Sequence, residues 1–95
     1  MKTSQRSLLL FRQEQLLRQI QDTLPLLLQG SLHQNPSQRG YHLTGKVNQK
    51  TVTKYVRRDL VPQVRLMARN HLKVRQLLVR LSQVNWQLLQ FPPDS

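Results

Sequence analysis

The chain contains no cysteine, which excludes a disulfide scaffold, a zinc ribbon and a thiol nucleophile. Acidic residues are almost as scarce, with four Asp and Glu in 95 residues. These four acids are Glu14, Asp22, Asp59 and Asp94. Their wide separation in the sequence does not provide the clustered carboxylates that general acid–base or two-metal chemistry needs. We therefore expect a protein that is not an enzyme and has no cofactor and no small-molecule substrate.

Glycines, histidines and long apolar runs are also few. The three glycines form no phosphate-cradling loop, and the three histidines, His33, His42 and His71, are too scattered for a metal site. The longest apolar run is the four residues 8–11, which is far short of a membrane span and shorter than the apolar stretch of a secretory signal. The sequence therefore predicts a cytoplasmic protein without a membrane-spanning segment or a bound metal.

Only 38% of the residues are apolar and 5% are aromatic. A chain of this length buries roughly 60–65% of its unfolded surface, so that its single core is thin. We expect a partner that covers more apolar surface, either a second copy in a homodimer or a larger protein or ribonucleoprotein complex.

Positive charge is the most pronounced property of the chain. Fifteen Lys and Arg oppose the four acids, giving a net charge of +11. Such an excess attracts polyanions, and in a small domain it is the electrostatic footprint of nucleic-acid binding. Improved solubility, an acidic protein partner and an anionic membrane surface remain alternative explanations. The first prediction is binding to DNA or RNA, and the sequence does not separate the two.

The first 30 residues predict a helix and a turn. Residues 4–23 are rich in Leu, Gln and Arg, which favour helices, and Thr3 or Ser4 can cap the start. Pro25 is expected to end this helix and to begin a short turn that Gly30 terminates. An apolar stripe formed by Leu9, Leu16, Ile20 and Leu27 is widened by Leu10, Leu17, Leu24 and Leu28.

Residues 31–58 predict a loop and a β-hairpin. Residues 33–40 have loop composition, and residues 41–47 and 51–56 are enriched in Thr, Val and Tyr. If Asn48 and Gln49 form a two-residue turn, one face carries Tyr41, Leu43, Val47, Val52 and Val56. The other face then carries His42, Thr44, Lys46, Thr51, Thr53 and Tyr55. The register is open, because Gln49 occupies a position where glycine is preferred.

Residues 59–90 predict one long helix, followed by a tail at residues 91–95. Asp59 is a candidate N-cap, Pro62 falls in the first turn, and Phe91-Pro92-Pro93 stops the helix. Apolar positions at alternating spacings of four and three form a coiled-coil-like seam. The seam consists of Leu60, Val64, Met67, His71, Val74, Leu78, Leu81, Asn85 and Leu88.

Two cationic surfaces are the predicted nucleic-acid site. The first is the hairpin, where six cations occur without an acid: Arg39, Lys46, Lys50, Lys54, Arg57 and Arg58. The second lies opposite the helical seam and contains Arg65, Arg69, Lys73 and Arg80. A two-stranded ribbon fits the major groove of DNA and can also follow an RNA backbone. Ordinary solvated surfaces are the alternative in both cases, but such surfaces usually alternate in sign. Tyr55 is a candidate for base stacking.

The motifs of residues 24–89 also resemble a known family. They are Gly30-Ser31-Leu32, then Tyr-x-Leu and Lys-Val in residues 41–47, Lys-Thr-x-Thr-x-Tyr-Val in residues 50–56, and Leu-Ser-x-x-Asn in residues 81–85. This pattern is similar to that of short, uncharacterised prokaryotic proteins whose genes often lie beside transposases. Many members carry a cysteine cluster after Gly-Ser-Leu, which residues 33–40 lack. The resemblance implies an accessory role in a mobile-element or RNA-guided complex, and any metal or redox role attached to those cysteines does not carry over to this chain.

Together these patterns predict a single α+β domain over residues 1–95, ordered as helix, hairpin and long helix. The two helices are expected to pack antiparallel along the seam, with the hairpin projecting where the chain reverses. The predicted function is nucleic-acid binding through phosphate contacts and shape. The alternative is a protein-interaction module that binds a larger partner through the seam.

Overall fold

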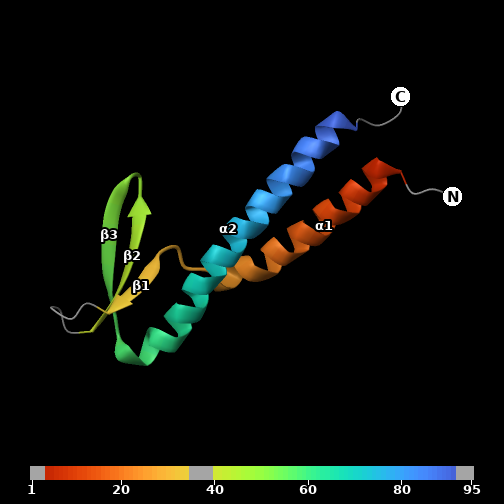
Figure 1. Ribbon diagram of the computed structural model, residues 1–95. Coiled ribbons are helices and arrows are strands. Elements are labelled where there is room, and N and C mark those ends of the chain that lie inside the picture. Colours follow the sequence, from red (N-terminus) through yellow and green to blue (C-terminus); the bar gives the residue numbers. More distant parts are fainter. Residues whose placement is uncertain (1–3, 35–39, 92–95) are drawn as a thin grey trace. The chain divides into compact units, whose positions relative to one another are not determined.

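The computed structural model describes residues 4–34 and 40–91, which form two helices and a three-stranded antiparallel sheet (Figure 1). The predicted α+β class and element order are confirmed. The chain divides into two compact units. The helical unit is described for residues 4–25 and 74–91, and the sheet unit for residues 26–34 and 40–73. The long helix α2 (Val61–Gln90) contributes its first part to the sheet unit and its second part to the helical unit.

Helix α1 (Gln5–Thr23) begins and ends as its sequence predicts. Ser4 is extended, and its Oγ accepts a hydrogen bond from the Ser7 amide at 3.1 Å, which satisfies one free donor of the first turn. Pro25 lies in the short 3₁₀ turn η1 (Leu24–Leu26) that follows. Leu24 keeps helical φ and ψ, and the α-helix ends there because Pro25 has no amide hydrogen to continue the hydrogen-bond ladder.

The helical unit pairs α1 with the second part of α2 in antiparallel fashion, as predicted (Figure 1). Two hydrogen bonds fix this direction. The side-chain amide of Gln13 donates from Nε2 to Asn85 Oδ1 at 2.8 Å, and the Arg6 guanidinium donates to the Phe91 backbone carbonyl at 2.7 Å. Apolar side chains from both helices are buried in this unit, namely Leu9, Ile20, Val74, Leu77 and Val84.

The sheet unit contains β1 (Ser31–Gln34), β2 (Tyr41–Val47) and β3 (Lys50–Val56), paired in the order β1-β2-β3. The hairpin of β2 and β3 is confirmed. Strand β1 corrects the expectation that the loop begins at residue 33. It pairs Ser31–Gln34 antiparallel with β2, while residues 35–39 of the predicted loop lie outside the described residues.

The hairpin register follows from its two-residue turn. Val47 pairs with Lys50, so that Asn48 and Gln49 alone form the turn, with φ values of 51° and 67°. Positive φ at both central residues matches the type I′ turn, whose twist suits two antiparallel strands. The register therefore groups the side chains on the two faces as the sequence predicts.

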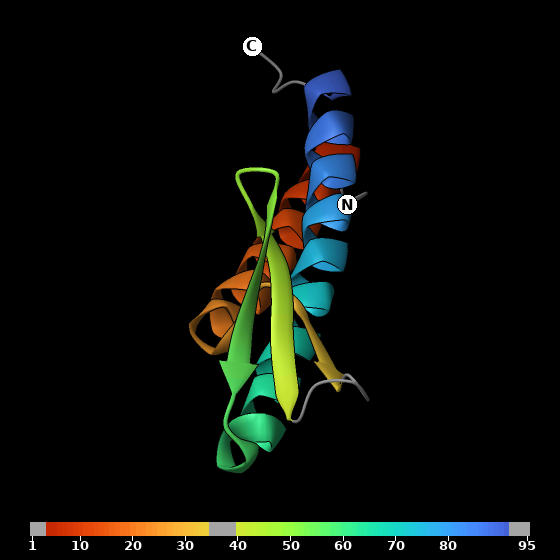
Figure 2. The same cartoon turned by 90° about the vertical axis from the view of Figure 1, so that its left-hand side faces the viewer.

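One face of the sheet packs on the first part of α2. The buried cluster is formed by Leu43, Val56, Val61, Val64 and Ala68. The backbone of residues 26–28 is tied to the same part of the helix, because the Leu28 amide donates to the Met67 carbonyl at 3.1 Å and Asn70 Nδ2 donates to the Leu26 carbonyl at 2.7 Å. Within residues 26–34 and 40–73, no element covers the opposite face of the sheet, as Figure 2 shows from that side.

The start of α2 differs from the predicted N-cap at Asp59. A 3₁₀ turn, η2 (Arg58–Leu60), precedes the α-helix, and Asp59 lies inside that turn rather than before the helix. The Asp59 carboxylate is instead 3.6 Å from Arg57 Nε. Pro62 is the second residue of α2, where the missing amide hydrogen costs nothing.

The predicted seam of α2 is divided between the two units. Val64 is buried, and Met67 and His71 are half-buried, in the sheet unit, whereas Val74, Leu81 and Leu88 are buried or half-buried in the helical unit. The predicted antiparallel pairing of the helices is therefore confirmed only from Val74 onward, since the first part of α2 packs on the sheet. Leu78 and Asn85, also predicted seam positions, are exposed, and Leu77 and Val84 are buried in their place.

None of the helices within the described ranges is both long enough and apolar enough to cross a membrane.

Candidate nucleic-acid interface

Charge is distributed unequally between the two units. Residues 26–73 carry nine Lys and Arg against one acid, a net charge of +8, whereas the remaining residues carry six against three, a net charge of +3. In the described part of the sheet unit, the one ion pair joins Arg57 to Asp59, and both side chains are about 70% exposed. Exposed pairs of this kind contribute little, so the positive charge of this unit is available to a polyanion.

The open face of the sheet is defined by the strand register. Residues that are paired across strands point to the same side of a sheet, and the pairs opposite the buried cluster form three rows. We call this surface the open face: it contains the row His33–His42–Tyr55, the row Ser31–Thr44–Thr53, and the pair Lys46–Thr51. None of these eight side chains is acidic, and all are exposed or half-buried. The open face therefore combines rings, hydroxyl groups and a cation on one surface.

The ring row supplies a platform of planar side chains. His42 and Tyr55 meet edge to face, with ring centroids 5.9 Å apart and an interplanar angle of 74°. Tyr55 is 66% exposed, whereas tyrosine side chains are usually more buried. His42 Nδ1 is buried and has no hydrogen-bond partner among the described atoms. An exposed ring held by a neighbouring ring is suited to stacking on a base.

Gly40 makes room for the Tyr55 ring. A Cβ at position 40 would lie 2.8 Å from Tyr55 Cε2, closer than real side chains approach. Gly40 also has a φ of +98°, which other residues rarely adopt. The glycine therefore permits both the chain entry into β2 and the observed position of Tyr55.

The hydroxyl row and Lys46 add polar groups to the same surface. The Oγ1 atoms of Thr44 and Thr53 are 3.4 Å apart across β2 and β3. Each hydroxyl retains further capacity as a donor or an acceptor. Lys46 lies at the end of the open face nearest the hairpin turn, and its side chain is exposed. These groups can contact phosphate oxygens, sugars or base edges.

The predicted hairpin cations do not share one surface. Lys46 lies on the open face, but Lys54 pairs with the core residue Leu43, and Lys50 pairs with Val47, so both belong to the opposite face. Arg58 lines a hollow of about 230 Å³ together with Tyr55, at the far end of the open face from Lys46. Arg39 lies outside the described residues.

The cations of α2 in the sheet unit form a line. Arg65, Arg69 and Lys73 are exposed and four residues apart, which places them on one side of the helix. Arg65 and Arg69 line a groove of about 370 Å³ with Ser31 and Leu32 of the edge strand β1. This line is therefore a second cationic surface of the sheet unit, at the side of the sheet rather than on the open face.

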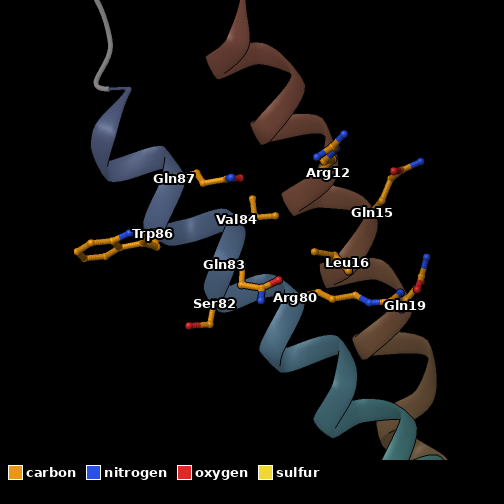
Figure 3. A pocket seen from close by; sticks show the side chains of 10 residues that line it. All are labelled: Arg12, Gln15, Leu16, Gln19, Arg80, Ser82, Gln83, Val84, Trp86 and Gln87. Atoms are coloured by element: carbon orange, nitrogen blue, oxygen red, sulfur yellow. The ribbon is translucent and has the colours of Figure 1, made fainter.

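Arg80 belongs to the helical unit. It lines a groove of about 780 Å³ between α1 and the second part of α2, opposite Arg12, and Figure 3 shows it reaching toward Gln19. Glutamines are half of its other lining residues, beside Leu16, Ser82, Val84 and Trp86. The predicted site is thus divided, because the hairpin and the first part of α2 belong to one unit and Arg80 to the other.

Sequence reasoning missed the contribution of β1 to the open face. Ser31 and His33 extend the hydroxyl and ring rows onto a third strand. The alternation of Ser31, Leu32 and His33, with one apolar residue between two polar ones, was the available signal. Across residues 4–34 and 40–91, no three side chains of the metal-ligating types gather into one site.

No family model, curated protein or solved structure matches this chain. The resemblance to short proteins encoded beside transposases, and with it the mobile-element or ribonucleoprotein setting, therefore stays a prediction.

Proposed function

We propose that the sheet unit binds nucleic acid, with a single-stranded segment lying on the open face. The observation that carries this proposal is an acid-free surface with exposed rings in the unit that holds +8 of the net charge. The protein acts by binding, as an accessory factor without catalysis of its own.

Phosphate contacts supply most of the affinity. Lys46 and Arg58 lie toward opposite ends of the open face. The residue paired with Lys46 is Thr51, and the five steps from Thr51 to Val56, where β3 ends, extend for about 17 Å. A strand laid between these ends follows the sheet, while Arg57 supplies a further charge. Contacts of this kind do not depend on sequence and weaken as salt rises.

Ring stacking favours a single strand over a duplex. The bases of a duplex are already stacked on one another, whereas unpaired bases can stack on a side chain such as Tyr55. The neighbouring row of hydroxyl groups can bond to sugars or base edges in DNA and in RNA alike. Insertion of the sheet into the major groove of a duplex is the competing geometry, and it predicts a preference for the duplex.

The test is a matched pair of charge reversals. Lys46→Glu combined with Arg58→Glu changes the sheet unit, and Arg12→Glu combined with Arg75→Glu makes the same change of net charge in the helical unit. Fluorescence anisotropy at about 50 mM salt compares both variants with the parent chain. The labelled probes are single-stranded DNA and single-stranded RNA of about 12 nucleotides and a DNA duplex of about 12 base pairs.

We expect the sheet-unit variant to bind single strands on the order of 100-fold more weakly, and the helical-unit variant to stay within about threefold of the parent. Equal losses in both variants would mean that only net charge matters. Failure of the parent chain to bind any of the three probes would refute the proposal.

A further inference from the structure

Both helices of the helical unit expose leucine side chains. Leu10, Leu17 and Leu24 follow one another at seven-residue spacing and are 42%, 48% and 51% exposed. On α2, Leu78 and Leu89 are 48% and 75% exposed. Single exposed apolar residues are common, but a group of them on one surface marks an interaction site.

The two sides of the helix pair have different chemistry. One side is the groove in Figure 3, whose lining is rich in arginine and glutamine from both helices. The other side is marked by the hydrogen bond between Gln13 and Asn85. The grooved side of the helix pair therefore presents polar and charged groups beside Leu16, Val84 and Trp86.

The exposed leucines belong to the side of the Gln13–Asn85 bond. Residues three, four or seven positions apart share one side of a helix. Leu10 and Leu17 stand three and four residues from Gln13, and Leu78 and Leu89 stand seven and four residues from Asn85. We call this surface the leucine face; it consists of Leu10, Leu17, Leu24, Leu78 and Leu89 around the Gln13–Asn85 pair.

We propose that the leucine face binds a second copy of this chain, so that two helical units form a four-helix arrangement around a two-fold axis. This inference is independent of the proposed nucleic-acid binding. It identifies the occupant of the exposed part of the seam, where Leu78 and Asn85 are left uncovered by α1.

The chemistry of the face favours a second copy. None of the residues that define it is charged, and Arg75, exposed three positions before Leu78, is a cation at its edge. Of the nearby charges, Arg6 is bonded to the Phe91 carbonyl and Arg18 is paired with Glu14 at 2.8 Å. A two-fold axis near the Gln13–Asn85 pair brings polar groups to polar groups and leucines to leucines, as an isologous interface requires. A polar pair inside an apolar seam also fixes its alignment.

The size of the face also suits a dimer. Helix α1 has 19 residues, which is about 28 Å, and two adjacent helices are roughly 20 Å wide. The projected area is therefore roughly 550 Å², and the accessible area of a corrugated helical surface is larger. A standard interface buries about 800 Å² on each partner, so that the leucine face is of the required order.

Self-association has a consequence for binding. A dimer carries two sheet units, and two linked sites bind a long polyanion more tightly than either alone. The concentration of charge in the sheet unit leaves the helical unit with only +3, which limits the repulsion between two copies at this surface.

The test compares exposed apolar residues on and off the leucine face. Leu17→Gln with Leu78→Gln alters the face. Phe11→Gln with Val79→Gln alters apolar residues that are at least as exposed, 59% and 58% against 48% for both leucines, and that stand one position beyond Leu10 and Leu78. Glutamine is a good helix former and adds no charge. Sedimentation equilibrium gives the mass of each full-length chain, and circular dichroism confirms the helix content.

We expect the parent chain and the Phe11/Val79 variant to have twice the 11.2 kDa chain mass, and the Leu17/Leu78 variant to be a monomer. A monomeric parent overturns the proposal, as does a leucine-face variant that stays dimeric or a control variant that dissociates equally.

A second measurement remains valid if the leucine-face variant fails to fold. Because the chain has no cysteine, Asn85→Cys introduces a single thiol near the proposed axis, and Val79→Cys introduces one away from it. A disulfide needs Cα atoms within about 7 Å. Mild oxidation is expected to give a covalent dimer for Asn85→Cys and a monomer for Val79→Cys. The opposite result, or equal yields from both, contradicts a two-fold interface on this face.

Discussion

The sheet unit and the helical unit contain similar numbers of residues but differ in net charge and in surface chemistry. The sheet unit buries one apolar cluster and presents cations, hydroxyl groups and rings on its surface, together with exposed apolar residues such as Leu66 and Leu72. The helical unit carries less than half as much net charge and exposes leucines. Charge attracts polyanions, and exposed leucine attracts apolar surface. This difference is the basis for proposing two binding surfaces in one small chain, each with its own partner.

Helix α2 shows the same contrast within a single element. Its first part carries the line Arg65, Arg69 and Lys73, while its buried side packs on the sheet. Its second part carries Leu78 and Leu89 on the leucine face. One continuous helix therefore contributes a cationic surface to one unit and an apolar surface to the other.

Two exposed aromatic residues, one in each unit, should differ most in their effect on oligonucleotide binding. Tyr55 in the sheet unit and Trp86 in the helical unit are 66% and 65% exposed. We expect Tyr55→Ala to weaken binding of a single-stranded oligonucleotide by about 10- to 100-fold, because stacking contributes about 1–3 kcal/mol per base. Trp86→Ala is expected to change it by less than about twofold. Fluorescence anisotropy with the same probe measures both.

The Tyr55→Phe variant keeps the ring and removes the hydroxyl, and is expected to bind nearly as well as the parent. If Trp86→Ala causes the larger loss, the helical unit rather than the sheet unit contacts the bases.

A smaller effect, of opposite sign, is expected at the hairpin turn. Gln49 has a φ of 67°, a left-handed conformation that costs a residue with a side chain about 1–2 kcal/mol and costs glycine little. We expect Gln49→Gly to raise the free energy of unfolding in urea by up to about 1 kcal/mol. The mass of the assembly is expected not to change, because the turn is outside the helical unit.

Asn48 is the natural control for this turn. Asn tolerates positive φ better than glutamine does, so Asn48→Gly is expected to gain less stability than Gln49→Gly. A net loss of stability from Gln49→Gly would show that the turn is not the one described.

Local features of the fold could be predicted from the sequence. The Ser4 cap, the interruption at Pro25 and the β2–β3 hairpin each depend on residues close together in the chain. Strand β1 was missed because its local signal is short: it has four residues and one apolar side chain, and it exists through pairing with β2. Pairing partners distant in sequence leave little local signal.

The sequence predicted which residues belong to the candidate site better than it predicted how those residues are arranged in space. The faces of the hairpin followed from the alternation around Asn48 and Gln49, and this placed Tyr55 beside His42. The prediction of one basic hairpin surface is wrong, because Lys50 and Lys54 lie on the opposite face of the sheet from Lys46. Likewise, the heptad spacing of α2 predicted one seam, but a sheet and a helix each cover part of that helix.

The central claim is that nucleic acid binds to the sheet unit, on its open face. The most direct test is a titration of ¹⁵N-labelled protein with a short single-stranded oligonucleotide, followed by the shifts of its backbone amide signals. If the open face binds the oligonucleotide, the largest shifts are expected at His33, His42, Thr44 and Tyr55, with small shifts around the Arg12–Arg80 groove. The largest shifts at that groove, with an unperturbed open face, would contradict it.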